Sequence, residues 1–384
     1  MQNKKTVSFS RRRVVQGIGG VGVAAALTGC PAGNTLAGPK YSRPLSRKPF
    51  AAPRVSMDNI VRVIVGHRPY RPGGFVVRRE QFDAKQIIHN YGHGGGGISL
   101  SWGSSALAVR EASGLPLGQA AVIGAGIMGL TTARLLQDAG WQVTIYTRDV
   151  SRHSTSNVGA GQWAPTSVFR EGVATPAFEV QYKQAARIAH HAYQNMVGPH
   201  YGVSFAENYF FGPDALRQPY HLRELPELFT SVAQLQPDEH PFPFEKVKRV
   251  VTMLVEPAIF LRRVRDDFYR AGGKFVVRDF KALDEILALR ESTIFNCTGL
   301  GARALFGDED MVPAKGQLVF IPPDPAVDYL TIGGGDGVNY MFPRTGEIVL
   351  GGSWRRNDWS RTPDPEITER IIRNHQNLFE AMRA

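Results

Sequence analysis

The strongest constraint on the fold is a glycine-patterned turn between two short apolar runs at residues 120–149. The run "AAVI" predicts a buried strand, and Gly124-x-Gly126-x-x-Gly129 follows it directly. "LTTARLLQDAG" then has helical spacing, and "WQVTIYTRD" returns as a second strand. A strand, a glycine turn and a helix in this order offer free backbone N–H groups to a phosphate, which predicts a Rossmann-like dinucleotide-binding lobe.

The end of the second strand carries two candidate contacts for the adenosine half of a dinucleotide. Asp149 follows Gly129 by 20 residues, where an acidic side chain accepts hydrogen bonds from ribose hydroxyl groups. Arg148 is the alternative contact. The glycine pattern by itself does not distinguish NAD from FAD.

A second glycine run, Gly94-Gly95-Gly96-Gly97, precedes this lobe in "HNYGHGGGGISLSWG". It removes side chains where a flat ring can approach the backbone, and a helix that includes Ser99 is predicted to start there. A helix start aimed at the pyrimidine edge of a flavin stabilises the negative charge of the reduced ring, which favours FAD.

Neither the histidines nor the cysteines predict a metal or a disulfide framework. His89 and His93 have the i, i+4 spacing of a metal pair, but glycine interrupts the helix that such a pair needs, so we expect hydrogen bonding or capping. Cys30 and Cys297 are the two cysteines of the sequence. Cys297 is expected to pack in a core rather than to react.

The first thirty residues have the pattern of an export signal. "SRRRVVQ" resembles the twin-arginine signal of bacteria, and "LTGC", which ends at Cys30, resembles a lipobox. The apolar run between them is about half of the ~20 residues that cross a bilayer as a helix. We therefore expect export by the twin-arginine route to a periplasmic or extracytoplasmic location, with a lipid on Cys30 that holds the protein at the membrane.

The positive net charge belongs to the N-terminal segment. Ten of the 45 Lys and Arg residues and none of the 34 Asp and Glu residues lie before residue 58, which leaves 35 basic against 34 acidic residues in the rest. A nearly neutral globular part gives no indication of nucleic-acid binding. Residues 31–57 have Pro, Gly and Ser without apolar periodicity and predict a linker.

Several separated stretches resemble the D-amino-acid oxidase family of FAD-dependent oxidoreductases. The glycine turn with its flanking strands resembles the family's FAD-binding segment, and "STSNVGAGQWAP" resembles the flavin-side loop that follows. "TIFNCTGLGARALFGDEDMVPAKGQLVFI" resembles its central strand, and "NYMFPRTGEIVLGGSW" its substrate-lobe strands. "GHRPYRP" and "HNYGHGGGGISLSWG" resemble two motifs that close the family's sequences.

The order of these motifs predicts a circular permutation. In the family the last two motifs come at the C-terminus, whereas here they precede the first strand of the FAD lobe. "SGLPLGQ" at 113–119 would be the new join, and the new ends would fall between the helix "PEITERIIRNHQNLFEAM" and the strand "NIVRVIV". The alternative is a chain with duplicated terminal motifs, but "HNYGHGG" occurs once.

The resemblance implies roles for individual residues. Arg68 matches the arginine that binds the substrate carboxylate, and Tyr340 matches a tyrosine that assists it. Asp336 stands where the family has another tyrosine, in the loop that covers the site. Thr298 and Gly299 follow a buried strand that is expected to end near the cofactor.

The implied activity is oxidation of a D-amino acid to a 2-oxo acid, with ammonia and hydrogen peroxide as the other products. Oxygen or another electron acceptor reoxidises the flavin, and the sequence does not specify the oligomeric state. A membrane-tethered amine or D-amino-acid dehydrogenase that uses a quinone or carrier is one alternative, and a secondary amine is another possible substrate. A flavin-binding protein without turnover is a third reading, and a nicotinamide-dependent dehydrogenase is the least favoured.

The expected fold class is α/β, with a Rossmann-like FAD-binding lobe and a mixed or antiparallel substrate lobe in permuted order. The chain is divided into the following expected segments: signal 1–30, linker 31–57, FAD lobe 58–165, substrate lobe 166–245, FAD lobe 246–310, substrate lobe 311–356, and a returning helix 357–384.

Overall fold

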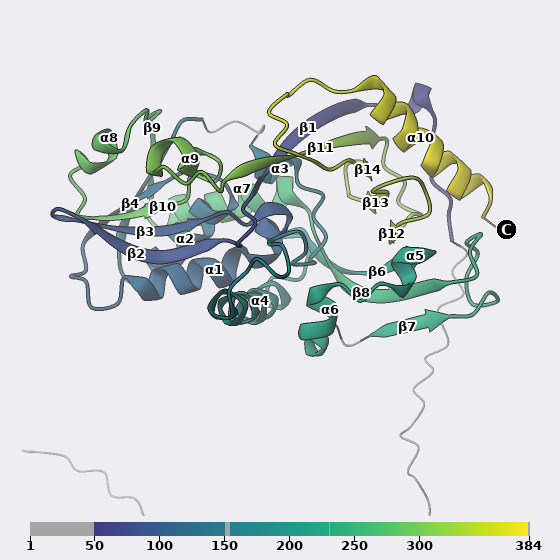
Figure 1. Ribbon diagram of the computed structural model, residues 1–384, viewed down its shortest axis with the longest axis horizontal. Helices are drawn as coiled ribbons and strands as arrows, with labels where there is room; N and C mark the ends of the chain where they lie inside the picture. Colours follow the sequence, from purple (N-terminus) through teal and green to yellow (C-terminus); the bar gives the residue numbers. More distant parts are fainter. Residues whose placement is uncertain (1–49, 150–153, 230, 383–384) are drawn as a thin grey trace, which may run out of the picture. The chain divides into compact units, whose positions relative to one another are not determined.

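The computed structural model describes residues 50–382, apart from 150–153 and 230. The expected export signal and Cys30 therefore lie outside the described residues, as does most of the expected linker 31–57. In the described part, the strands form two sheets, which we call the smaller sheet and the larger sheet (Figure 1). Of the helices in this part, none is long and apolar enough to cross a membrane.

The smaller sheet confirms the order of strand, glycine turn, helix and strand. Its order is β2-β3-β10-β4-β5-β9, and all neighbours are parallel except β2 and β3. β4 pairs with β5, and α2 (Ile127–Asp138) connects them, which is the Rossmann-like arrangement. The strands are β2 (Val76–Phe82), β3 (Lys85–Tyr91), β4 (Gln119–Ile123), β5 (Gln142–Thr147), β9 (Lys274–Val277) and β10 (Thr293–Asn296).

Helices cover both faces of the smaller sheet (Figure 1). One face packs against α1 (Gly97–Glu111), α2, α4 (Pro176–Gln194) and α7 (Pro257–Arg270). The other face packs against α8 (Leu283–Leu287) and α9 (Gly301–Phe306). α1 is the helix expected after the glycine run, and it contacts α4 so closely that a Cβ at Gly103 would overlap the carbonyl group of Ala185.

The larger sheet is mixed, as expected for a substrate lobe. Its order is β1-β11-β14-β13-β12-β6-β8-β7, with β15 beside β11, and the pairs are antiparallel except β12 with β6. The strands are β1 (Arg62–Tyr70), β6 (Val203–Phe211), β7 (Val232–Leu235), β8 (Val247–Val255), β11 (Val312–Ile321), β12 (Tyr329–Ile332), β13 (Tyr340–Pro343), β14 (Ile348–Gly351) and β15 (Arg355–Arg356). The short helices α5 (Pro213–Leu216) and α6 (Tyr220–Glu224) connect strands of this sheet. The short helix α3 (Thr155–Val158) follows β5 and contacts β1.

β1 and β8 lie in a different sheet from the one we expected. Both fall in segments assigned to the FAD lobe, 58–165 and 246–310, but both pair within the larger sheet. β1 pairs with β11 over its whole length, from Arg62 beside Phe320 to Tyr70 beside Val312. Apolar strand patterns predict a strand but not its partner, because the partner is set by register with distant residues.

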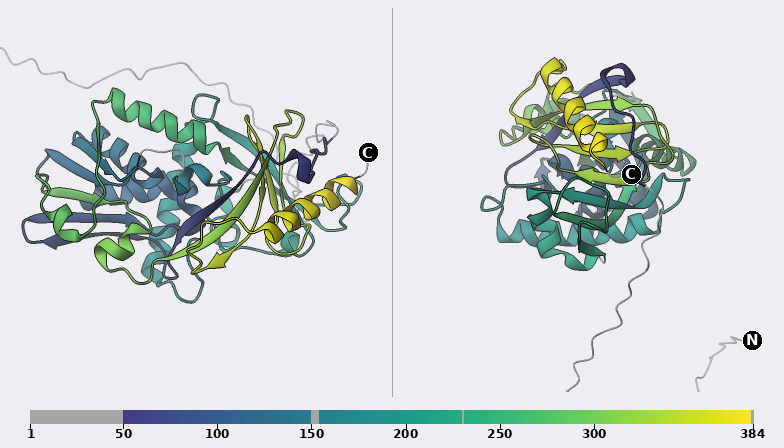
Figure 2. Two further views of the ribbon diagram at one scale, coloured as in Figure 1. Left: turned by 90° about the horizontal axis from the view of Figure 1, so that it is seen from above. Right: turned by 90° about the vertical axis from the view of Figure 1, so that its right-hand side faces the viewer.

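The helix α10 (Pro365–Glu380) lies along one face of the larger sheet (Figure 2). This face is the one that is turned away from α3. Its N-cap residue is Asp364, whose side chain accepts hydrogen bonds from the backbone N–H groups of Glu366 and Ile367 at 3.0 and 3.4 Å. Pro365 occupies the first helical turn, where its missing N–H costs nothing. Both ends of the described chain reach this side of the sheet, because the Tyr329 hydroxyl group donates to Ala51 O at 2.9 Å and lies 3.8 Å from Met382 Sδ.

The last residues of the expected linker also belong to this core. The Phe50 ring packs edge-on against Tyr209, Phe242 and Tyr329, with ring centroids 5.4, 5.4 and 5.2 Å away. Pro53 is buried. Folding therefore includes residues 50–57 although their composition resembles that of a linker.

We expect Phe50→Ala to lower the free energy of unfolding by about 2 kcal/mol, less than for a fully buried phenylalanine because Phe50 is half-buried. Urea unfolding followed by circular dichroism measures this change. Phe50→Leu is the matched control and should lose less than half as much. Equal stability of the alanine variant and the unsubstituted protein would show that the segment does not contribute to the core.

Candidate active site

The two sheets line a single large cleft of 2010 Å³. Its walls come from the glycine turn before α2, the C-terminal ends of β5 and β10, and one face of β1 and β13. Ligands of open parallel sheets bind at these C-terminal strand ends. The sequence-predicted residues that line the cleft are Arg68, Gly94, Gly95, Gly97, Gly124, Gly126, Arg148, Asp149, Thr298, Gly299 and Tyr340. Gly96, Ser99 and Gly129 do not line it.

Each of the three glycines of the first turn has a different structural role. Gly124 has φ +108°, and a Cβ there would lie 2.5 Å from the carbonyl oxygen of Cys297 on the neighbouring strand. A Cβ at Gly129 would overlap the carbonyl oxygen of Gly124, so Gly129 lets α2 pack against its own strand. Gly126 is the N-cap of α2, and a Cβ there would meet Ser156 Oγ alone, at 3.3 Å. The helix N-terminus therefore lines the cleft at Gly126, where the Ser156 hydroxyl group accepts from the Ile127 N–H at 3.0 Å.

The ends of β5 and β10 form the next part of the wall. Arg148 and Asp149 follow β5 directly, and both are exposed. Thr298 and Gly299 follow β10, and Gly299 has φ +58°, a left-handed conformation that suits glycine. β5 and β10 lie on either side of β4, so these four residues line the cleft along the C-terminal ends of the parallel strands.

A hydrogen-bond network holds the turn after β10. The Asn296 carboxamide oxygen accepts from the N–H and the hydroxyl group of Thr298 at 3.2 and 2.7 Å. Its nitrogen donates to His89 Nδ1 at 2.9 Å, so His89 carries its proton on Nε2, which donates to Glu80 at 3.2 Å. Burial lowers the pKa of His89, which keeps the ring neutral. His89 therefore has a hydrogen-bonding role in the smaller sheet.

The structure explains the second glycine run by a close contact that the sequence did not indicate. A Cβ at Gly94 would overlap the carbonyl oxygen of Ser167, and one at Gly96 would overlap the side chain of Val168. A Cβ at Gly97, the first residue of α1, would make only ordinary contacts, the nearest at 3.8 Å with His93 and Met128. The run is needed largely because the chain at 165–168 passes directly over it. We expected the glycines to make room for a flat ring, and this does not hold for Gly96, which faces Val168.

Ser99 does not line the cleft, and its side chain holds two segments of the chain together. Its hydroxyl group accepts a hydrogen bond from the backbone N–H of Ala164 at 3.0 Å and lies 3.4 Å from Gln162 O. It thereby ties α1 to the loop at 154–165, which resembles the family's flavin-side loop. Side-chain direction within the first helical turn decides this, and the sequence spacing does not reveal it.

His93 stacks in the core beside this helix start. Its ring lies parallel to Phe75 at 4.6 Å, and the side chain is 1 % exposed. Neither ring nitrogen has a hydrogen-bond partner among the described residues. Burial lowers the pKa of His93 to about 3, so the ring is neutral at ordinary pH.

Arg68 and Tyr340 meet on the cleft face of the larger sheet. Arg68 Nη2 donates to the Tyr340 hydroxyl group at 3.4 Å. Two glycines provide the space, because a Cβ at Gly316 would overlap the Arg68 guanidinium and one at Gly351 would overlap the Tyr340 ring. Arg68 Nη1 is buried and has no hydrogen-bond partner among the residues that the structure describes. A buried N–H group of a cation is costly when it has no acceptor, so this pair is suited to a carboxylate.

Arg344 is a site residue that the sequence did not single out. It is nearly buried, lines the cleft, and donates to the carbonyl oxygens of Gly159 and Ala160, the latter at 2.9 Å. Its other nitrogen pairs with Glu347 at 3.3 Å. Arg344 therefore joins the hairpin after β13 to the loop at 154–165. Its position after a proline in "MFPRTGEI" gives no sequence signal for this contact.

The loop that carries Asp336 is held by its backbone. Arg370 and Asn374 of α10 both donate to Asp336 O, Asn374 at 3.1 Å and Arg370 at 2.5 Å. The Asp336 side chain is exposed. The difference from the tyrosine that the family has at this place therefore concerns an exposed carboxylate on a loop that is docked onto α10.

Comparison with known proteins identifies the family. Residues 119–384 match the model of a family named DAO and described as FAD dependent oxidoreductase. A D-amino-acid oxidase of Rubrobacter xylanophilus is 28% identical over 284 residues, which cover 70% of this chain and 80% of that protein. A D-aspartate oxidase of Homo sapiens is 25% identical over 256 residues, which cover 66% of this chain and 73% of that protein.

Solved structures support the fold. The iminodiacetate oxidase from Chelativorans sp. BNC1 has a TM-score of 0.52 and 16% sequence identity, over 68% of this chain and 79% of that one. A glycine oxidase from Bacillus cereus has a TM-score of 0.51 and 15% identity, over 68% and 78% of the two chains.

The site fits the cofactor that the family requires, which is FAD. Gly126 places no side chain of its own at the N-terminus of α2, which lines the cleft beside Ser156, and this arrangement would suit a pyrophosphate. Gly97 begins α1 at the other part of the same wall, also without a side chain. Both helix starts favour negative charge and would stabilise the diphosphate and a reduced flavin ring.

We expect His93 to make the protein less stable in acid. Because its pKa is about 3 in the folded state and near 6.5 when unfolded, the unfolded state gains the proton first as pH falls below 6.5. Between pH 6.5 and 4.5 this should cost about 2 kcal/mol of unfolding free energy. Comparison of urea unfolding at both pH values with His93→Leu measures it. The same pH dependence in the leucine variant would assign the effect to other groups.

Proposed function

We propose that this chain, which belongs to the DAO family of FAD-dependent oxidoreductases, oxidises D-amino acids to 2-oxo acids and releases ammonia and hydrogen peroxide. The observation that carries the proposal is the Arg68 guanidinium, held in the cleft beside Tyr340 with a buried nitrogen that no described residue binds. The relatives named D-amino-acid oxidase support this substrate class.

Arg68 and Tyr340 would orient the substrate by its carboxylate. A planar guanidinium binds both carboxylate oxygens through parallel hydrogen bonds, and the Tyr340 hydroxyl group, 3.4 Å from Arg68 Nη2, adds a further donor. Two-point binding of this kind fixes the direction of the bond between Cα and its hydrogen. The larger sheet holds both residues, so this orientation depends on rigid strands and not on a loop.

When bound, FAD supplies the acceptor for the α-hydrogen, which leaves the substrate as hydride. The chain's own residues bind the carboxylate, orient Cα and neutralise charge. We assign no general base, because the substrate amine needs only to be neutral, so the rate should rise toward alkaline pH. Overall, one D-amino acid, one oxygen and one water become one 2-oxo acid, one ammonia and one hydrogen peroxide.

We propose in addition that residues 1–30 direct export by the twin-arginine route and that Cys30 carries a lipid. The support is the order of basic run, apolar run and cysteine in the sequence. A route for folded proteins suits a protein that must bind FAD before export. At a membrane, a quinone or carrier is the alternative acceptor to oxygen, and the two are distinguished by whether oxygen reoxidises the reduced protein.

We also propose that the chain is a circular permutant of the family's order. Residues 62–111 supply β1 to β3 and α1, and they precede residue 119, where the family match begins. β3 lies beside β10 at the centre of the smaller sheet, as an integral strand. The proposed new ends approach one another at Tyr329, which contacts both Ala51 and Met382. The proposed join at 113–119 is mostly exposed.

We expect the permutation to be reversible. A chain opened within 114–118, with its residue 384 joined to residue 50 by a short flexible linker, should fold and bind FAD, because it keeps the core contacts of Phe50 and neither change breaks a strand or helix. A chain opened between Gly272 and Lys274, beside an edge strand, provides a control for opening at a loop. Circular dichroism and flavin absorption measure the outcome. A re-joined chain that does not bind FAD, beside a control that does, would contradict the proposal.

We expect anaerobic mixing of the FAD-loaded protein with D-amino acids to bleach its visible absorption, while L-amino acids leave it unchanged. Arg68→Met should lower the second-order rate constant of bleaching on the order of 100- to 1000-fold, because two charge-assisted hydrogen bonds are lost. The matched control is Arg79→Met, an exposed arginine on β2. A yellow protein that no amine bleaches would exclude the oxidase and favour a flavin-binding protein without turnover.

A further inference from the structure

The Arg68 side chain lies over a neighbouring row of residues that runs across the larger sheet. Gly66 of β1 pairs with Gly316 of β11, and Lys315 pairs with Arg355 of β15. Continuing this antiparallel register places Trp354 beside Gly316. The Arg68 guanidinium leans over Gly316, where no side chain obstructs it, and reaches the Trp354 ring with its Cζ 5.0 Å from the ring centroid.

Trp354 belongs to a series of contacts in which two aromatic rings lie between two arginines. Its ring packs edge-on against Tyr70 at 5.8 Å, with an angle of 82° between the rings. The guanidinium of Arg356 lies over the other ring, with its Cζ 5.0 Å from the Tyr70 centroid. Tyr70 is 2 % exposed, so this series of contacts is anchored in the protein interior. Trp354 is therefore supported by a buried ring on one side and contacts Arg68 on another.

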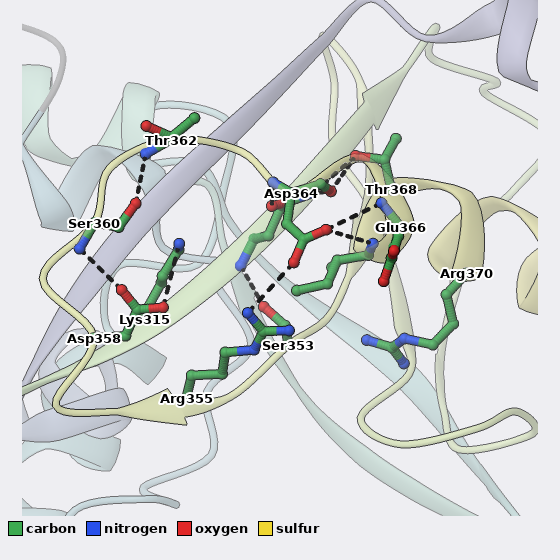
Figure 3. Close-up of polar contacts among 12 residues, drawn as sticks. Lys315, Ser353, Arg355, Asp358, Ser360, Thr362, Asp364, Glu366, Thr368 and Arg370 are labelled. Atoms are coloured by element: carbon green, nitrogen blue, oxygen red, sulfur yellow. Dashed lines mark hydrogen bonds and ion pairs between the residues drawn. The ribbon is translucent and has the colours of Figure 1, made fainter.

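The chain on both sides of Trp354 is fixed as well. The Ser353 hydroxyl group accepts from the backbone N–H of Gln317 at 2.8 Å. Arg355 pairs with Asp364 at 3.3 Å, and Asp364 in turn caps α10 (Figure 3). A tryptophan between two such anchors is held before any ligand binds.

We propose that Trp354 is a positioning residue for Arg68, and that its ring holds the guanidinium with the free Nη1 edge toward the substrate carboxylate. This inference rests on the proposed function. Among the described residues, no carboxylate forms an ion pair with Arg68, and its hydrogen bond to Tyr340 is long, at 3.4 Å. The ring of Trp354 is therefore the contact that selects one arrangement of a flexible side chain.

The physical effect is on binding. A guanidinium stacked on an indole ring is attracted by the electron-rich face and keeps its N–H edge free, because stacking uses the flat side of the cation. An arginine that is already in place loses less rotamer freedom when the carboxylate binds. Loss of the ring should weaken carboxylate binding, while hydride transfer from a substrate that is fully bound should change little.

The test compares Trp354→Leu with Trp354→Phe in the FAD-loaded full chain. Acetate, butyrate and benzoate are titrated while the flavin spectrum is followed, which measures Kd without turnover. We expect the leucine variant to bind the carboxylates about tenfold more weakly and the phenylalanine variant to recover most of the loss. With D-alanine, the apparent Kd for flavin reduction should rise in the same way, while the limiting rate changes less than about threefold.

The same substitution in an Arg68→Lys variant tests whether Trp354 acts through Arg68 or contacts the ligand directly. In Arg68→Lys, which lacks the flat cation, Trp354→Leu should have no further effect on Kd if Trp354 acts through Arg68. An equal loss in both backgrounds would overturn the inference, as would an unchanged Kd in Trp354→Leu or a fall confined to the limiting rate. Should the leucine variant lose FAD, Trp354→Met takes its place in the same comparisons.

The results that would contradict the role of Trp354 differ from those that would contradict the oxidase activity. A protein that binds carboxylates but is bleached by no amine would contradict the oxidase activity, and the Kd comparison would still decide the role of Trp354. A protein whose flavin spectrum responds to no carboxylate would overturn both.

Discussion

The ladder between β1 and β11 is the contact on which the site depends. It pairs residues 62–70 with residues 312–320, about 250 positions later in the chain, without a break in register. Because side chains alternate along a strand, this register places Arg68 on the cleft face and leaves His67 facing the other side. A slip by one residue would reverse every side chain of β1, and Arg68 would no longer face Tyr340.

Missing side chains shape the site as much as present ones. Gly316 and Gly351 give Arg68 and Tyr340 room to lie flat on the sheet, and Gly126 leaves a helix N-terminus open. Gly94 and Gly96 instead let a neighbouring loop pass closely. A planar group occupies the place of a Cβ at Gly316 and Gly351, a backbone carbonyl oxygen does so at Gly94, and the Val168 side chain does so at Gly96. Recognition groups are thus set into the sheets themselves and supported by strands, not by mobile loops.

Local patterns were sufficient for the parts of the fold that form within about thirty residues. The strands and helix around Gly124, the helix α1 and the helix α10 were all predicted from apolar spacing and glycine turns. Arg68 and Tyr340 were paired through resemblance, since no spacing brings residues so distant together. The sheet of β1, the packing of Phe50 and the contacts of Arg344 could not be predicted, because each depends on register or on packing between distant segments.

The contacts of Tyr329 have a mechanical consequence. Its hydroxyl group meets Ala51 and Met382, and Phe50 packs on its ring, so both chain ends are attached to the same central strand β12. A force applied at Phe50 enters the larger sheet on the face opposite the cleft, where the aromatic rings around Phe50 resist it first. β1, which carries Arg68, follows this segment along the chain, so the aromatic contacts of Phe50 lie between the point of pulling and that strand. A molecule held by its N-terminus would thus bear tension first in this aromatic cluster, on the face of the larger sheet opposite the cleft.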